Sequence, residues 1–167
     1  MIYTHIPYSI NRNYGKALND FLSLINDDDW VVIMDYDAMF THNHWFNVVT
    51  EAIKEGDALI TCPTNRTGQS AQLAPGVDRD NHDMKYHYAK GKEFYEKYGN
   101  EVRPFTCDGL MSGYVMIFPK RLIGRVTEGT QLGIDNEIHQ KAKNKGAPVK
   151  ILPGVYVYHA YFRLWLK

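Results

Sequence analysis

The amino-acid sequence predicts an α/β fold with a mostly parallel central sheet, and three observations lead to this prediction. Residues 30–34 form a short apolar run rich in β-branched side chains, which is typical of a strand buried on both faces. Apolar residues recur with helical spacing both before and after this run. The elements up to residue 62 therefore alternate between strands and helices. This order favours parallel strands joined by right-handed crossovers.

Local patterns give the bounds of these first elements. Residues 2–6 predict the first strand. A helix over residues 15–25 is predicted because apolar side chains repeat there every three to four positions. Thr41 is a favourable N-cap for a second helix, which Gly56 is placed to end. Residues 57–62 indicate the next buried strand.

The rest of the chain alternates irregular and amphipathic segments. Residues 64–80 show no period, and a loop of this length in a compact domain tends to be functional. Residues 81–98 predict a helix, and its expected apolar stripe consists of Met84, Tyr88, Gly91, Tyr95 and Tyr98. The remaining predictions are a strand at 114–118, a short helix at 119–123, a helix at 135–145, and strands at 149–152 and 155–159.

Composition bounds the class of protein. The chain has 167 residues, 44% of them hydrophobic and 23% charged, which predicts one globular domain over residues 1–167. The formal net charge at pH 7 is zero, and this balance argues against a nucleic-acid partner, which needs a basic face. We find no membrane-spanning apolar run and no signal peptide, so we expect a cytoplasmic protein. Assembly into a homo-oligomer stays open.

Two carboxylates directly follow the central predicted strand. Asp35 and Asp37 stand one residue apart after residues 30–34, and in open α/β sheets ligands bind at the carboxyl ends of the strands. Side chains alternate along a strand, so both carboxylates of an extended Asp-x-Asp point the same way, and a divalent cation would neutralise them. The alternative is that the two residues only end the strand and begin a turn, where Asp is favoured.

Asp135 and His159 also carry side chains suited to chemistry. Asp135 starts a predicted helix and shares one helical face with Ile138 and Ala142, which points it toward the core side. It is either a carboxylate base at a cleft or an N-cap of that helix. His159 ends an apolar strand. It is either a structural histidine or, beside an Asp-x-Asp pair, a third metal ligand.

Taken together, these segments resemble the family 2 glycosyltransferases and their relatives of the GT-A fold. The resemblance covers most of the chain and implies a GT-A-like three-layer α/β/α sandwich that is shortened at the N-terminus. The matching segments, in chain order, are Asn13-Tyr14-Gly15 before a helix, the strand that leads into Asp35-Tyr36-Asp37, the turn Ser112-Gly113 before a strand, the helix start Ile134-Asp135-Asn136-Glu137, and the strand that ends at His159.

The resemblance implies a role for each matched residue. Asp37 and His159 would hold a metal ion, Asp35 would face the donor's ribose or a metal-bound water, and Asp135 would be the catalytic base. The residues expected on the nucleotide or donor side are Asn13, Lys16, Asp35, Tyr36, Ser112, Gly113 and Arg163. Those expected on the acceptor side are Asp108 and Arg66.

The implied activity is that of a metal-dependent glycosyltransferase of the hexosyltransferase type. It would move a sugar from a UDP- or GDP-linked donor to a hydroxyl of a glycan, protein or small molecule, with inversion. A histidine ligand suits Mn²⁺ better than Mg²⁺, which prefers oxygen ligands, although Mg²⁺ stays an alternative.

Two departures from the family pattern allow a different function. Only residues 2–6 precede the Asn-x-Gly segment, where the family has a strand, a helix and a second strand, and Ile134 stands where the family commonly has Glu. The chain is therefore either a minimal enzyme or a non-catalytic nucleotide- or sugar-binding module that needs a partner. An Asp-x-Asp pair at a strand end would also suit a metal-dependent phosphohydrolase or a purely structural α/β domain.

Overall fold

A computed structural model describes residues 1–130 and 133–161, and this part of the chain has the predicted α/β class. The strands are β1 (Ile2–His5), β2 (Trp30–Met34), β3 (Ala38–Phe40), β4 (Leu59–Thr61), β5 (Arg103–Pro104), β6 (Val115–Pro119), β7 (Val149–Ile151) and β8 (Val157–His159). The helices are α1 (Tyr14–Leu22), α2 (Trp45–Ala52), α3 (Met84–Tyr98), α4 (Lys120–Ile123) and α5 (Ile134–Asn144), with 3-10 helices η1 (Ile53–Glu55) and η2 (Ser70–Gln72). No described helix has the length and apolar character that a membrane crossing requires.

The central sheet is mixed. In the described residues it has six strands in the order β1-β2-β6-β4-β7-β5, and β3 and β8 form a separate pair. The pairs β1–β2 and β4–β7 are parallel, whereas β6 is antiparallel to both β2 and β4, and β5 is antiparallel to β7. The strands β2 and β4, which follow each other in the predicted strand–helix alternation, are separated in the sheet by β6. All five residues of β6 are buried, which fits an interior position in the sheet.

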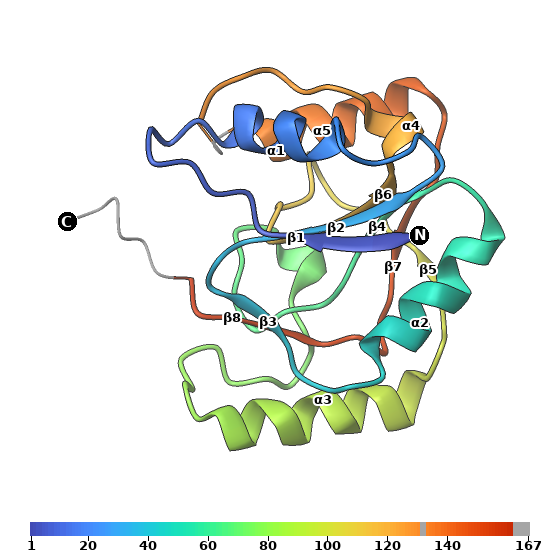
Figure 1. The fold of residues 1–167 in the computed structure, drawn as a ribbon. Coiled ribbons are helices and arrows are strands. Elements are labelled where there is room, and N and C mark those ends of the chain that lie inside the picture. Colours follow the sequence, from blue (N-terminus) through green and yellow to red (C-terminus); the bar gives the residue numbers. More distant parts are fainter. Residues whose placement is uncertain (131–132, 162–167) are drawn as a thin grey trace.

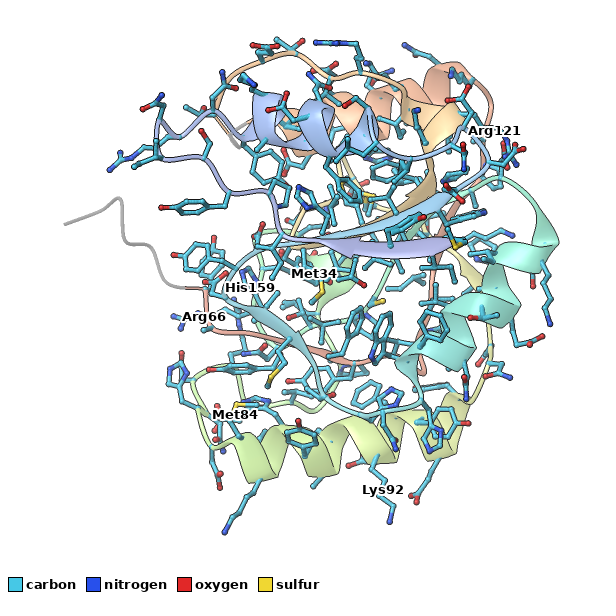
Figure 2. All side chains as sticks on the ribbon, in the orientation of Figure 1. Met34, Arg66, Met84, Lys92, Arg121 and His159 are labelled. Carbon is cyan, nitrogen blue, oxygen red and sulfur yellow. The ribbon has the colours of Figure 1, made fainter. Side chains whose placement is uncertain are left out.

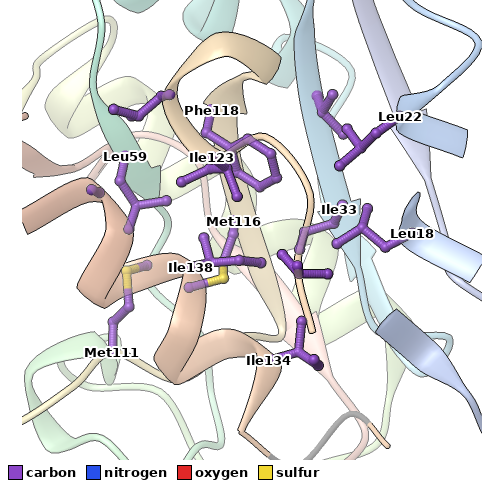
Figure 3. Close-up of a cluster of buried hydrophobic side chains, with 14 of the residues drawn as sticks. Leu18, Leu22, Ile33, Leu59, Met111, Met116, Phe118, Ile123, Ile134 and Ile138 are labelled. Carbon is purple, nitrogen blue, oxygen red and sulfur yellow. The ribbon is translucent and has the colours of Figure 1, made fainter. Parts of the chain in front are cut away.

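The sheet lies between two layers, as Figure 1 shows: α1, α4 and α5 cover one face, and α2, α3 and the β3–β8 pair lie on the other side. Successive residues of β2 alternate between these layers. Val31 and Ile33 belong to the cluster beneath α1 and α5 (Figure 3), whereas Val32 and Met34 belong to the cluster that α2 covers. This alternation confirms that the run 30–34 is apolar because both of its faces are buried.

Thr41 does not cap a helix, contrary to the prediction. Residues 38–40 form β3, which sequence analysis missed, and α2 begins only at Trp45. The Thr41 hydroxyl donates to the carbonyl oxygen of Tyr156 (2.7 Å) and is buried. Thr41 therefore extends the contact between the β3 and β8 segments, because its hydroxyl bonds to the backbone just before β8 and not to the start of a helix.

The buried face of α3 also differs from the expected stripe. Its buried residues are His87, Gly91 and Phe94, whereas Tyr88 is 52% exposed. Phe94 packs against Tyr156, so α3 covers the β8 segment, and its Tyr95 packs against the cluster on this side of the central sheet. A side chain at Gly91 would collide with Thr41, which explains the glycine in this helix. The packing partner, and not the local spacing of tyrosines, determines which face is buried.

Candidate metal centre

Asp35 and Asp37 lie in the tight turn that joins β2 to β3. The turn is closed by a hydrogen bond from the Ala38 amide to the Asp35 carbonyl oxygen (3.1 Å). The Asp35 amide donates to the carbonyl oxygen of Tyr114 (3.0 Å), which ties the start of the turn to the β6 segment. The two aspartates therefore lie in a turn, which is the alternative given in the sequence analysis, and not in an extended strand end. The turn places both carboxylates near one point at the carboxyl end of β2.

The β3–β8 ladder brings His159 to this turn. Ala38 is paired with His159 in antiparallel register, and the Ala160 amide donates to the Asp37 carbonyl oxygen (2.9 Å). Residues more than 100 positions apart thus become neighbours through a short strand pair. Figure 2 shows His159 at the same edge of the molecule as Arg66.

The three side chains form a compact cluster. His159 Nε2 lies 3.3 Å from Asp37 Oδ1 and 3.7 Å from Asp35 Oδ2. One ligand atom of each residue lies within 4.8 Å of the others, a geometry that could hold a metal ion. The side chains of Asp37 and His159 are 8% and 6% exposed, and that of Asp35 is 15% exposed. Carboxylates with so little hydration repel each other, and a cation between them would offset that cost.

The His159 ring is held in one orientation. Its Nδ1 donates to the Arg66 carbonyl oxygen (2.9 Å), since a carbonyl can only accept. The Tyr114 ring stacks on the imidazole with centroids 5.3 Å apart, and the Tyr114 hydroxyl donates to the Cys62 carbonyl oxygen. Because Nδ1 is the donor to this carbonyl, Nε2 is the ring nitrogen that faces the two carboxylates.

Asp135 lies in the first turn of α5 and borders the same region. It does not cap the helix: Gly133, with φ of 101°, is the N-cap, so the interpretation of Asp135 as a cap is wrong. Gly113 packs so closely on Asp135 that an added Cβ would lie 2.5 Å from the Asp135 Cβ. Burial raises the pKa of Tyr14, and the charges of Asp35 and Asp135 raise it further. The Tyr14 phenol therefore lies within electrostatic range of both carboxylates.

The contact at Gly113 gives the first prediction. Gly113→Ala forces either Asp135 or the backbone before β6 to move, because the Cβ would lie 2.5 Å from the Asp135 Cβ. We expect the free energy of unfolding to fall by about 1–3 kcal/mol, the usual cost of overpacking. Urea denaturation measures this change. Gly68→Ala is the matched control, because a Cβ there meets nothing within 4 Å. Equal stability of the two variants would contradict the close contact.

The expected donor-side residues lie in different settings. Asn13 caps α1: its Oδ1 accepts from the amides of Lys16 and Gly129, both at 2.9 Å. Lys16 forms an exposed ion pair with Asp20 (2.6 Å), a contact that costs little to release. Tyr36 lies between Asp35 and Asp37 in the turn that joins β2 to β3, called here the metal-centre turn, and it is 59% exposed.

The backbone at Ser112, which was also expected on the donor side, is held by hydrogen bonds to the Gln72 side chain. The Ser112 amide donates to Gln72 Oε1 (2.7 Å), and its carbonyl accepts from Gln72 Nε2 (3.1 Å). These two bonds hold the backbone at Ser112, next to Gly113, which contacts Asp135. Arg163 lies outside the described residues.

The expected acceptor-side residues are joined by the loop 64–80. Gln69 Nε2 donates to the carbonyl oxygens of Asp108 (3.1 Å) and Leu110 (3.2 Å), which fixes this loop to the segment before β6. Asp108 is exposed. Arg66 contacts the metal centre through its backbone carbonyl, while its guanidinium lies 3.5 Å from Asp80. The long loop is therefore ordered by side-chain amides, and it adjoins the candidate site.

Sequence reasoning missed several residues that build the site, and Tyr114, which stacks on His159, is one of them. Asn65 is buried, and its Oδ1 accepts from the His159 amide (2.8 Å). Gln72 is fully buried and bonds Thr61 Oγ1 (2.8 Å) as well as Ser112. Tyr14 stands in the Asn-x-Gly segment, yet no role was expected for it. The available indication was a concentration of Asn and Gln in a loop too long to be a simple connection.

Comparison with known proteins adds no family to this description. A scan against models of protein families found no match, and a search of curated proteins found none either.

Proposed function

We propose that this chain is a metal-dependent glycosyltransferase with a GT-A-like fold, which moves a sugar from a UDP- or GDP-linked donor to an acceptor hydroxyl with inversion. In this proposal Asp37 and His159 hold a divalent cation together with Asp35, and Asp135 is the catalytic base. The observation that carries the proposal is the convergence of two carboxylate oxygens and one imidazole nitrogen within 4.8 Å, in the turn at the carboxyl end of β2.

The orientation of His159 supports a cation at this point. When Nδ1 alone carries a proton, Nε2 presents its lone pair to Asp35 and Asp37, an arrangement that is repulsive unless positive charge lies between them. A proton on Nε2 or a metal ion supplies that charge. A hydrogen bond from the other ring nitrogen to a backbone carbonyl is typical of metal-binding histidines, which favours the metal. One nitrogen and several oxygen ligands suit Mn²⁺ better than Mg²⁺.

A divalent cation bound there supplies Lewis-acid stabilisation of the charge on a diphosphate leaving group. The protein's own contribution is to hold the ligands still. The turn fixes Asp35 and Asp37, and the stacked Tyr114 ring together with the Arg66 carbonyl fixes His159. Preorganised groups cost no reorganisation when charge develops during the reaction.

Asp135 is proposed as the group that accepts the proton of the acceptor hydroxyl. Its carboxylate lies at the start of α5 against Gly113, and the charges of Asp135 and Asp35 both raise the pKa of the Tyr14 phenol. A hydroxyl bound between Asp135 and the donor would lose its proton to this carboxylate as its oxygen attacks the anomeric carbon. Attack from the face opposite the diphosphate gives inversion.

The proposal is tested by calorimetric titration of UDP, GDP and their sugar conjugates into the protein, with and without Mn²⁺. We expect one nucleotide to bind, and only when Mn²⁺ is present, because the diphosphate oxygens would complete the coordination of the ion. Metal-dependent binding with no transfer to any acceptor would instead favour a non-catalytic nucleotide- or sugar-binding module. If neither Mn²⁺ nor any nucleotide binds, the proposal is wrong.

A further inference from the structure

A second polar site lies beside the candidate metal centre. A cleft of ≈ 620 Å³ is lined by Arg66, Thr67, Gly68, Arg79 and Tyr161. It is connected to the metal centre through two contacts: the Arg66 carbonyl accepts from His159 Nδ1 (2.9 Å), and the Tyr161 ring meets the His159 ring edge-on at 5.2 Å. Figure 2 shows Arg66 next to His159 at this edge.

The cleft adjoins the candidate metal centre through Arg66, whose backbone contacts the edge of the imidazole opposite to the carboxylates. His159 Nε2 faces Asp35 and Asp37, whereas Nδ1 faces the Arg66 backbone. A diphosphate bound through the metal would approach the Nε2 side. A group in the cleft would therefore stand beside the donor and not in its place.

The charged side chains that line the cleft are two arginines. The Arg66 guanidinium lies 5.8 Å from the centroid of the Tyr161 ring, so an aromatic face supports it. Asp78 and Asp80 flank Arg79 in the chain, yet neither carboxylate lines the cleft. Among the described residues, Arg79 has no ion-pair partner. The guanidinium groups of Arg66 and Arg79 can therefore both donate hydrogen bonds to a group bound in the cleft.

The Arg66–Asp80 ion pair does not block this use. Its closest atoms are 3.5 Å apart, and the Asp80 side chain is 84% exposed. Exposed pairs of this kind contribute little, so an incoming anion can replace Asp80 at small cost. Carboxylates and phosphates match the planar fork of a guanidinium and can accept two parallel hydrogen bonds from it.

We propose that this cleft binds an anionic group of the acceptor, a carboxylate or a phosphate, and so restricts the acceptor to negatively charged molecules. The identification of the bound molecule as the acceptor rests on the proposed function. The binding of an anion in the cleft does not depend on turnover. Arg66 and Arg79 are the residues that determine this specificity. Thr67 and Gly68 also line the cleft.

The test compares charged probes with their uncharged counterparts. Glucuronate is titrated beside glucose, and glycerol phosphate beside glycerol, into the wild type and into Arg66→Gln and Arg79→Gln. Arg66→Gln leaves the bond to His159 intact, because that bond uses the backbone carbonyl. We expect at least one charged probe to bind roughly 10-fold or more tightly than its counterpart, and either substitution to remove that preference, since each deletes charge-assisted hydrogen bonds.

Arg103→Gln is the matched control. Arg103 lies on β5 and pairs with Glu101 (2.8 Å), so its substitution removes the same charge away from the cleft. We expect this variant to bind the probes as the wild type does. Equal binding of charged and uncharged probes, or an unchanged preference in Arg79→Gln, would overturn the inference.

A second titration separates this inference from the proposed function. With Mn²⁺ and the nucleotide, Arg79→Gln is expected to bind as the wild type does. If it weakens nucleotide binding as much as probe binding, the cleft serves the donor and the assignment to the acceptor is wrong. If the charged probes bind but Mn²⁺ and nucleotides do not, the proposed function fails while the anion site stands.

Discussion

Asp37→Ala is expected to abolish metal-dependent nucleotide binding. The variant removes the carboxylate closest to His159 Nε2 (3.3 Å), and with it one member of the only group of three such side chains among the described residues that could hold a metal ion. Residues that merely orient metal ligands contribute about 10–100-fold to metal affinity, so we expect the loss of a ligand to weaken Mn²⁺ binding by at least roughly 100-fold. Titration of Mn²⁺, followed by titration of the nucleotide at saturating Mn²⁺, measures both effects.

Asp27→Ala is the control for this variant. Asp27 precedes β2 at the end opposite to the metal-centre turn, its side chain is 78% exposed, and it pairs with Lys120 (3.1 Å). Its loss changes the net charge equally but leaves the cluster intact. We expect Mn²⁺ affinity within about two-fold of the wild type, on the order of what exposed pairs contribute. Unaltered Mn²⁺ affinity in Asp37→Ala itself would show that the cluster is not a metal site.

Asp135→Asn is expected to stop sugar transfer while nucleotide binding persists. The carboxamide has nearly the shape of the carboxylate, so it fits against Gly113, but it cannot accept the proton of an acceptor hydroxyl. A general base is typically worth about 10²–10⁴ in rate, and we expect a loss of turnover in that range. Transfer is followed as release of the nucleoside diphosphate, and Mn²⁺-dependent nucleotide binding is measured on the same sample to show that the donor site is intact.

Glu137→Gln provides the comparison within the same helical turn. Glu137 pairs with Lys141 (2.9 Å) and accepts from the Thr127 amide, a bond that the carboxamide oxygen of glutamine can also accept. The variant therefore loses one negative charge close to Asp135 without losing its anchor to the loop. Turnover close to that of the wild type is expected. If Asp135→Asn and Glu137→Gln reduce turnover to a similar extent, the effect is one of local charge and Asp135 is not the base.

The sequence indicated Asp35, Asp37 and His159 one by one, but it did not indicate the buried residues that bring them together. Asp35 and Asp37 stand out because they interrupt an apolar strand, and His159 because it ends one. The local pattern did not show that the aspartates lie in a turn, since a turn and an extended strand end have the same residue preferences. The residues that hold His159, namely Asn65 and Tyr114, lie far from it in the chain and have no distinguishing local spacing.

The sequence by itself determined the class of fold and the location of β2, α1, α5 and β8, because apolar runs and helical spacing are properties of neighbouring residues. Only the tertiary structure decided that β6 separates β2 from β4, that α3 buries Phe94 in place of Tyr88, and that β3 pairs with β8. These outcomes depend on contacts between distant segments, whose free energy comes from joint burial and from hydrogen bonds across the ladder. The pairing of Ala38 with His159 is the decisive case, since it turns an acidic turn and a strand-end histidine into one site.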